Sequence, residues 1–356
     1  MKEKRLPLIL GILCLALIIT ALPFMSACAK PAPPVKPIEL TYSHMFPSAY
    51  GQALLIEDWA KEIEKRTEGR VKITVYPGST LTKAPECYEG VVKGTSDIGL
   101  TCLAYTRGRF PLMEVIDLPG YRFNAMVTTR VADDLYKKFK PTELADTHVL
   151  YLYAHIPGVI STTKKPVRTL EELKGMKIRA TGLSAKIVEA LGAVPVTMPK
   201  EEQYEALRKG TADGTTNAPN ELKGWKTAEV CKYTTIVPDV GYVTAFWVGM
   251  NLGRWNTLPK DIQKIFTEVS EEWVSRTGER WNEMELEGYK YGKEQGHVFI
   301  YPPPEECARW VAACKPLAEK YLKDMEAKGL PGREALDYRQ ELIEKYGKMY
   351  PPLKFD

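Results

Sequence analysis

Histidine is scarce in this chain, and the common catalytic motifs are missing from it. Only four histidines occur among 356 residues, and they are scattered: His44, His148, His155 and His297. The sequence contains no P-loop, G-x-G-x-x-G, H-E-x-x-H or G-x-S-x-G motif. These absences weigh against the usual nucleotide-binding enzymes, metalloproteases and serine hydrolases, so we predict that the chain is not an enzyme. Because catalytic groups can also assemble from distant segments, an exported enzyme is kept as an alternative.

Cysteine spacing and charge pattern weigh against two further classes. The cysteines beyond residue 28 are odd in number and form no C-x-x-C pair: Cys87, Cys102, Cys231, Cys307 and Cys314. We therefore expect neither a metal site nor a cofactor, and whether a metal ion bridges protein and ligand is left open. Lys and Arg are interspersed with Asp and Glu from residue 57 onward, without a basic stripe or an RNA-binding pattern. No nucleic-acid partner is expected.

The first thirty residues have the order of an export signal. A basic MKEKR precedes the apolar run LPLILGILCLALIIT and then ALPFMSAC, which ends in small residues before Cys28. This ending resembles a bacterial lipobox, whose cysteine is lipidated, and a proline-rich spacer follows it. We therefore predict a signal peptide at 1–27, lipidation of Cys28 and a tether at 28–37. Cleavage after Ala29 and an uncleaved anchor over 6–25 are the alternatives, and all three place the following domain outside the cytoplasm.

The remainder is longer than a single core usually holds, and strands alternate with helices along it. Residues 38–44 and 71–77 have strand character, with an amphipathic helix between them. A helix over 84–93 then leads to a short strand at 96–100. This β-α-β-α-β order predicts an α/β domain with a mainly parallel sheet, whose ligand crevice lies at the carboxyl ends of the strands.

Aromatic residues and one histidine follow these strand ends. Tyr42, His44 and Phe46 lie at the end of the first strand, and Tyr105 lies in the loop after the third. The crevice rule makes them candidates for the rim of a binding site. Core packing is the alternative for each, because aromatic side chains fill cores more often than they line sites.

Residues 149–163 have the character of two strands broken by Pro157-Gly158, and with the segment TLEELKGMKIRATG that follows a second α/β unit begins and repeats this order. Its strand MKIR ends in Arg179, and its later strand ADGTTN ends in Asn217, so both residues sit where a crevice would lie. A guanidinium is costly to bury without a partner, and its planar fork matches a carboxylate. Arg179 therefore predicts either a ligand carboxylate or an internal ion pair. Asn217 is either a ligand contact or a turn residue before Pro219.

The last hundred residues are mainly helical. From Pro259 onward, apolar residues recur at the spacing of one face of a long helix: Ile262, Ile265, Phe266, Val269 and Trp273. This stripe predicts packing against a core. Residues 304–329 and 333–346 are further helical candidates that carry no chemistry of their own.

Several motifs between Pro166 and Thr234 occur in a fixed order: L-x-x-L-x-G-x-K-I-R, L-G-A-x-P-V, Y-x-A-L-x-x-G-x-x-D-G, an asparagine and E-V-x-K-Y. S-H-M-F-P, G-T-S-D-I-G-L and F-P-L…D-L-P-G precede them, and W-N-T-L-P follows. In this order the sequence closely resembles the DctP-type solute receptors of tripartite ATP-independent periplasmic (TRAP) transporters. The resemblance covers roughly residues 38 to 330.

The resemblance implies a two-lobed α/β clamp, like other periplasmic binding proteins, with a long helix that spans both lobes. Residues 38–155 and 241–281 are assigned to lobe I, and 156–240 and 282–356, with the C-terminal helices, to lobe II. A small organic acid would bind between the lobes, with its carboxylate on Arg179 and Asn217 as a second polar contact.

The resemblance also implies partners and a place. The receptor would deliver its acid to the small and large membrane subunits of an ion-coupled TRAP transporter, from the periplasmic side of a membrane that holds its lipid or anchor. A receptor for a different importer or for a sensor is the alternative. Some members use a second arginine, for which Arg107, Arg109 and Arg168 are candidates, and MPKEE replaces a TPEE-like segment here. The acid and its number of carboxylates are left open.

Overall fold

The computed structural model describes residues 36–106, 108–237 and 239–355. Residues from Ile38 onward form one compact unit. The predicted signal peptide, Cys28 and most of the predicted tether lie outside the described residues, so they stay predictions. No helix in the described part of the protein is both long enough and apolar enough to cross a bilayer.

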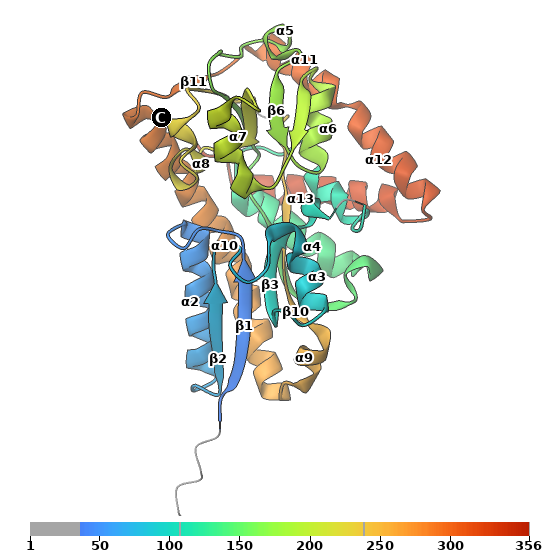
Figure 1. Cartoon of the computed structure of the whole chain (residues 1–356). Helices are drawn as coiled ribbons and strands as arrows, with labels where there is room; N and C mark the ends of the chain where they lie inside the picture. Colours follow the sequence, from blue (N-terminus) through green and yellow to red (C-terminus); the bar gives the residue numbers. More distant parts are fainter. Residues whose placement is uncertain (1–35, 107, 238, 356) are drawn as a thin grey trace, which may run out of the picture. The chain divides into compact units, whose positions relative to one another are not determined.

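The first lobe is built on a five-stranded sheet with the order β2-β1-β3-β10-β4 (Figure 1). Strand β1 (Ile38–His44) pairs in parallel with β2 (Val71–Tyr76) and β3 (Ile98–Cys102), as the alternating pattern predicts. Strand β10 (Ala245–Asn251) lies between β3 and β4 (Thr147–Ala154) and is antiparallel to both. The sheet is therefore mixed rather than mainly parallel, because a strand from far along the sequence fills its interior.

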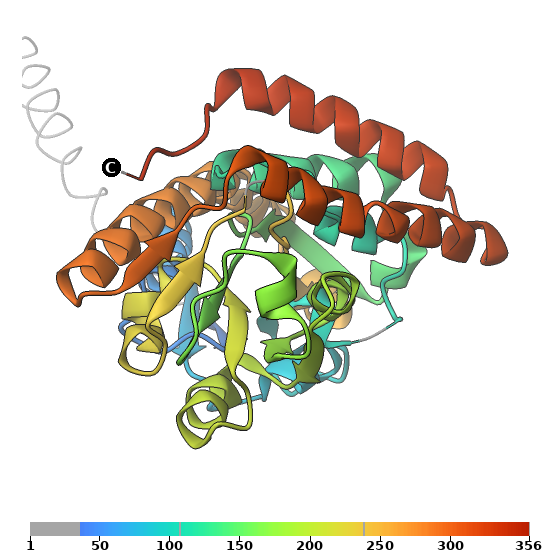
Figure 2. The same ribbon diagram turned by 90° about the horizontal axis from the view of Figure 1, so that it is seen from above.

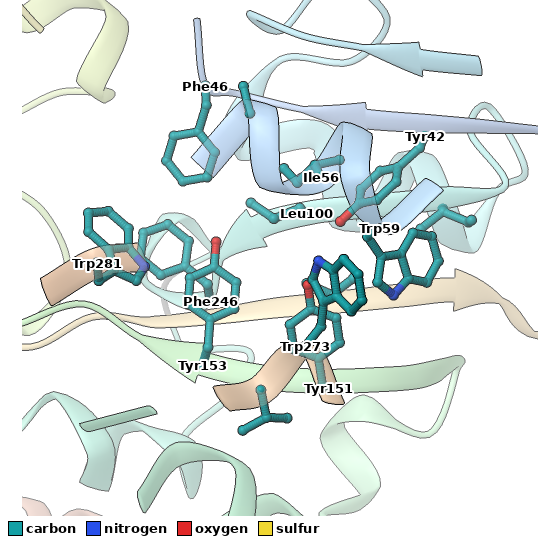
Figure 3. Close-up of a cluster of buried hydrophobic side chains, with 14 of the residues drawn as sticks. Tyr42, Phe46, Ile56, Trp59, Leu100, Tyr151, Tyr153, Phe246, Trp273 and Trp281 are labelled. Atoms are coloured by element: carbon teal, nitrogen blue, oxygen red, sulfur yellow. The ribbon is translucent and has the colours of Figure 1, made fainter. Parts of the chain in front are cut away.

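Helices cover this sheet and bury its aromatic side chains. Figure 3 shows Trp59 of helix α2 (Gly51–Arg66) and Trp273 of helix α10 (Lys260–Glu294) beside Tyr42 of β1, and all three side chains are almost fully buried. The carboxamide of Asn124 caps the first turn of α4 (Ala125–Phe139) by accepting a bond from the backbone N–H of Met126 at 2.9 Å. The helical elements of this lobe are α2 (Gly51–Arg66), η2 (Ala84–Glu86), α3 (Cys87–Val92), η3 (Leu103–Tyr105), η4 (Met113–Asp117), α4 (Ala125–Phe139), η5 (Thr142–Leu144) and α9 (Leu252–Thr257).

The second lobe is built on a six-stranded sheet with the order β11-β9-β5-β8-β6-β7. Strand β6 is parallel to β7 and β8, whereas β5 is antiparallel to β8 and β9. Its strands are β5 (Val159–Thr162), β6 (Lys177–Ala180), β7 (Val194–Thr197), β8 (Gly214–Asn217), β9 (Tyr233–Thr235) and β11 (Val298–Ile300). Its short helices are α5 (Leu170–Leu173), α6 (Leu183–Ala190), η6 (Lys200–Glu202), α7 (Gln203–Lys209), α8 (Glu221–Gly224) and η7 (Thr227–Glu229).

Helix α10 (Lys260–Glu294) has 35 residues and connects the two lobes. It packs against α2, α4 and β4 of the first lobe and against α8 of the second. At 1.5 Å per residue it is about 50 Å long, enough to run along both sheets, as Figure 1 shows. The predicted apolar stripe is confirmed in its first half, where Ile262, Phe266 and Val269 are buried.

The C-terminal helices divide between the lobes. Helix α11 (Pro304–Cys314) packs against α6, whereas α13 (Gly332–Met349) packs along α4 and is the red helix of Figure 2. The helix expected over 304–329 is two helices, because Pro316 has no N–H to continue α11 and begins α12 (Pro316–Ala327). The lobe boundaries assigned from the sequence stay a prediction.

Substitution of two glycines by alanine tests the contact of α10 with the second lobe. A β-carbon on Gly288 would lie 2.3 Å from the Cα of Asn220 and from the carbonyl of Pro219, whereas one on Gly347 in α13 would meet nothing within 4 Å. We expect Gly288→Ala to lower the free energy of unfolding by about 1–3 kcal/mol through overpacking. Gly347→Ala, the matched control, should raise it by up to about 1 kcal/mol through helix propensity. Urea unfolding measures both, and equal effects would contradict the close contact.

Candidate functional site

A cavity lies where residues of both lobes and of α10 meet. The first lobe lines it with Phe46 and Tyr105, the second with Arg179 and Lys200, and α10 with Trp281. The volume of this cavity is about 60 Å³. Polar groups in such a place have to be paired by protein, water or ligand.

Arg179 is the central charge of the cavity. Its side chain is only 4% exposed, and its Nε and Nη2 donate to the carbonyl oxygen of Met198 at 3.2 and 2.8 Å. Within the described ranges, no carboxylate forms an ion pair with it. The internal salt bridge that the sequence leaves open is therefore not seen in the described residues. A buried guanidinium held only by a neutral acceptor keeps donors available to an anion.

The turn after β6 explains how Arg179 reaches this position. Strand β6 pairs with β7 and β8, which places Arg179 opposite Val196 and Thr215 near the strand end. Gly182 follows with a φ of +55°, a conformation that side chains disfavour. A β-carbon there would also lie only 2.6 Å from that of Ala104 in the first lobe. Glycine is required here both by the turn and by the approach of the two lobes.

Lys200 and Glu221 form a second charged feature of the lining, and both belong to the second lobe. Lys200 is 6% exposed, forms an ion pair with Glu221 and donates to Oε1 of Gln203 at 2.7 Å. Thr215 donates to the same oxygen at 2.7 Å, and Nε2 of Gln203 donates to Thr227 at 3.3 Å. Burial lowers the pKa of the Lys200 ammonium to about 8, against the opposing effect of Glu221. Hydrogen bonds with neighbouring side chains thus fix the position of the Lys200 ammonium beside Glu221.

Aromatic rings form the apolar part of the wall. The ring centre of Phe46 lies 5.2 Å from that of Tyr50, 5.9 Å from that of Phe246 and 6.3 Å from that of Trp281. Figure 3 shows Phe46, Phe246 and Trp281 close to one another. The indole N–H of Trp281 and the hydroxyl of Thr181 are buried in the lining and have no hydrogen-bond partner among the described residues. Such groups are costly unless something in the cavity satisfies them.

The structure brings some of the predicted site residues together and leaves others apart. Arg179, Phe46 and Tyr105 line the cavity, whereas His44 and Asn217 do not. Their roles as ligand contacts stay predictions.

His44 lies between Tyr42 and Phe46 in the first-lobe core, with ring centres 6.2 and 6.1 Å away. Burial lowers the pKa of its imidazole to about 4, so it is neutral at pH 7. Asn217 ends β8, and its Oδ1 accepts a bond from Ser161 at 2.9 Å. The Nδ2 of Asn217 has no partner among the described residues, and its neighbour Ala218 is part of the lining.

Two of the three candidates for a second arginine, Arg109 and Arg168, do not line the cavity. Arg109 forms ion pairs with Glu89 and Asp146, and Arg168 is exposed. Arg107 lies outside the described residues. The lining does contain a second cation, Lys200, in the MPKEE segment where the resemblance implies a TPEE-like segment, and this difference was the signal that could have pointed to it. Glu221, Trp225 and Trp281 were also missed, because nothing in their local sequence separates them from core or surface residues.

Glu285 of α10 is part of a hydrogen-bonded chain that links this helix to Asn220 of the second lobe and Tyr50 of the first. Its carboxyl is fully buried and accepts bonds from the backbone N–H of Asn220, at 2.9 Å, and from the Asn220 carboxamide. The carboxamide oxygen of Asn220 accepts from the hydroxyl of Tyr50, a lining residue of the first lobe. Burial raises the pKa of Glu285 to about 8, although the bonds from Asn220 oppose this.

Similarity to known proteins agrees with this arrangement. The family model described as bacterial extracellular solute-binding protein, family 7, matches residues 42–324. The outer membrane transporter protein TsaT of Comamonas testosteroni is 28% identical over 333 residues, which cover 92% of this chain and 96% of that protein.

Two solved structures are similar over most of the chain. A TRAP periplasmic solute-binding protein of Desulfovibrio salexigens is 35% identical, with a TM-score of 0.77 over 87% of this chain and 97% of that one. Its ligand-binding site holds the C-terminus of a symmetry mate. A TRAP solute-binding protein of Rhodoferax ferrireducens, in complex with copurified benzoate, is 27% identical, with a TM-score of 0.84 over 88% and 99%.

The raised pKa of Glu285 predicts a pH dependence of stability. Between about pH 4.5 and about pH 8 the folded protein holds a proton that the unfolded protein releases. The stabilisation that comes with this proton is complete below that window and is lost as the pH rises through it, by at most about 1.4 kcal/mol per pH unit. Glu285→Gln cannot titrate, so its unfolding free energy should gain on that of the wild type between pH 5 and pH 8.

Denaturant unfolding at several pH values measures this difference. Subtracting the two curves removes the contributions of all other titrating groups. Glu279→Gln, at an exposed position of the same helix, is the matched control and should follow the wild type. Parallel curves for Glu285→Gln and the wild type would show that the buried carboxyl has no raised pKa.

Proposed function

The chain belongs to family 7 of the bacterial extracellular solute-binding proteins, and on this premise we propose that it captures a small organic acid and delivers it to the membrane subunits of a TRAP transporter. One observation carries the proposal: Arg179 is buried in a cavity between two lobes without a carboxylate partner in the described residues. In this role the protein binds and releases its ligand and makes or breaks no covalent bond.

Known relatives support a carboxylate as the ligand. Benzoate copurified with the Rhodoferax ferrireducens protein, and the Desulfovibrio salexigens protein holds the C-terminus of a symmetry mate in its ligand-binding site. Benzoate carries a carboxylate, and so does a free C-terminus. A carboxylate also matches the planar fork of Arg179, to which it would make charge-assisted hydrogen bonds worth about 1.5–3 kcal/mol each.

Closure of the lobes follows from the same interaction. The lobes already meet through a bond from the backbone N–H of Lys200 to the hydroxyl of Tyr105, at 3.2 Å, and one from Ser79 to Glu201, at 2.7 Å. Closing over no ligand would leave the Arg179 charge desolvated and unpaired, which is unfavourable. An anion that satisfies it binds the closed state more strongly than the open state, and this difference drives closure.

The place of action is proposed from the family and from the N-terminal sequence. Family membership supports a receptor outside the cytoplasm. We propose that Cys28 is lipidated and holds the domain at a membrane through the proline-rich tether, which the order of basic, apolar and small residues before Cys28 supports. The small and large membrane subunits of the transporter are the proposed partners.

A thermal-shift screen of the mature domain against mono-, di- and aromatic carboxylates tests the function. A ligand at about 100 times its dissociation constant should add roughly 2.7 kcal/mol to the stability of the wild type. Arg179→Ala should abolish this gain, because the variant lacks the cation that pairs with the carboxylate. Arg168→Ala, which removes an exposed arginine, is the matched control and should keep it. A wild type that no acid stabilises, together with a strongly destabilised Arg179→Ala, would make Arg179 a structural residue and end the proposal.

A further inference from the structure

The charges around the cavity do not balance. Among the lining residues that the structure describes, Arg179, Lys200 and Glu221 are the ones that carry charge at pH 7. His155 also belongs to this described lining, but burial lowers the pKa of its imidazole to about 4, so it is neutral. Because Lys200 forms an ion pair with Glu221, one positive charge of this described set is left uncompensated, that of Arg179.

The ion pair is built in advance of any ligand. Both partners belong to the second lobe, so their contact does not depend on closure. Gln203 accepts a bond from Lys200 at 2.7 Å and is itself held by Thr215 and Thr227. Lys200 also lies 5.9 Å from the ring centre of Trp225, which leaves its ammonium group fixed between an anion and an aromatic face. Releasing Lys200 to a ligand would leave Glu221 without its cation.

From this arrangement, which rests on the proposed function, we infer that Glu221 makes the receptor select flat monocarboxylates over dicarboxylates by keeping Lys200 in an ion pair. The first carboxylate of a ligand would take the free guanidinium of Arg179. Apart from Lys200, the groups of the described lining that a second carboxylate could meet are neutral or, in Glu221, anionic, so no free cation is left to balance its charge.

The wall accounts for the flat shape of the ligand. Phe46, Tyr50, Phe246 and Trp281 keep their ring centres within 6.3 Å of at least two of the others. Rings at these distances present edges and faces against which another ring packs well. An aromatic monocarboxylate fits both parts of the cavity: one charge for Arg179 and an apolar body for the rings.

The test compares two ligands that differ only in charge. Isophthalate and 3-nitrobenzoate have nearly the same size and shape, but isophthalate carries a second carboxylate where 3-nitrobenzoate carries a neutral nitro group. Calorimetric titration of the mature wild type should show 3-nitrobenzoate binding at least about 10-fold more tightly than isophthalate. In Glu221→Gln the freed Lys200 should accept the second carboxylate, and the ratio should fall by at least about 10-fold.

A double variant separates charge from folding. Lys200→Met with Glu221→Gln removes both members of the pair, leaves the Arg179 charge in place and should keep the wild-type ratio. A purely structural role of Glu221 would weaken both ligands alike and would not move the ratio.

Each of the other possible results contradicts one named part of the proposal. Equal binding of the two ligands by the wild type overturns the selectivity, whether or not the variants fold, and an unchanged ratio in folded Glu221→Gln overturns the role of Glu221. If neither ring acid nor benzoate binds while another acid of the screen does, the aromatic class is wrong and the carboxylate receptor stands. If no acid binds at all, the proposed function fails as well.

Discussion

A buried guanidinium without a carboxylate among the described residues is the constraint on which the rest of the site depends. Arg179 is held by one neutral carbonyl, so its charge is positioned but not neutralised. The nearby carboxylates are committed elsewhere, Glu221 to Lys200 and Glu285 to Asn220. Removing charge from water is costly without a counter-ion. The fold therefore places an uncompensated positive charge, which favours the binding of an anion, at the point where the two lobes meet.

One face of α10 contacts the groups of both lobes that surround the cavity. Trp281, Glu285 and Gly288 follow each other at i, i+4 and i+7, so they lie on the same side of the helix. Trp281 lines the cavity, Glu285 binds Asn220, and Gly288 lets the backbone at Asn220 approach closely. The segment that carries Asn220 is also bonded to Tyr50 of the first lobe. The helix thus acts as a common support for groups that come from distant parts of the sequence.

Local pattern was enough to predict much of the fold, and the central cation of the candidate site lies where the crevice rule places it. The α/β alternation, the long helix and the position of Arg179 at a strand end follow from periodicity, from the crevice rule and from the cost of burying charge. The position of strand β10 between β3 and β4 did not follow, because its neighbours are set by long-range pairing. The pair of Lys200 and Glu221 was missed for a related reason, since 21 residues separate its members. For His44, the position at a strand end was not enough to predict whether the side chain packs in the core or lines the cavity; it packs between Tyr42 and Phe46.

The contact at Gly182 would set a mechanical limit on the proposed closure. The lobes meet there through a glycine and the β-carbon of Ala104, with no flexible side chain between them. Long side chains at such a point would yield, whereas backbone and a methyl group do not. Under the proposed closure, this contact would act as a rigid stop that fixes the volume left for a ligand. Molecules too large for that volume would then be rejected by incomplete closure rather than by weak contacts.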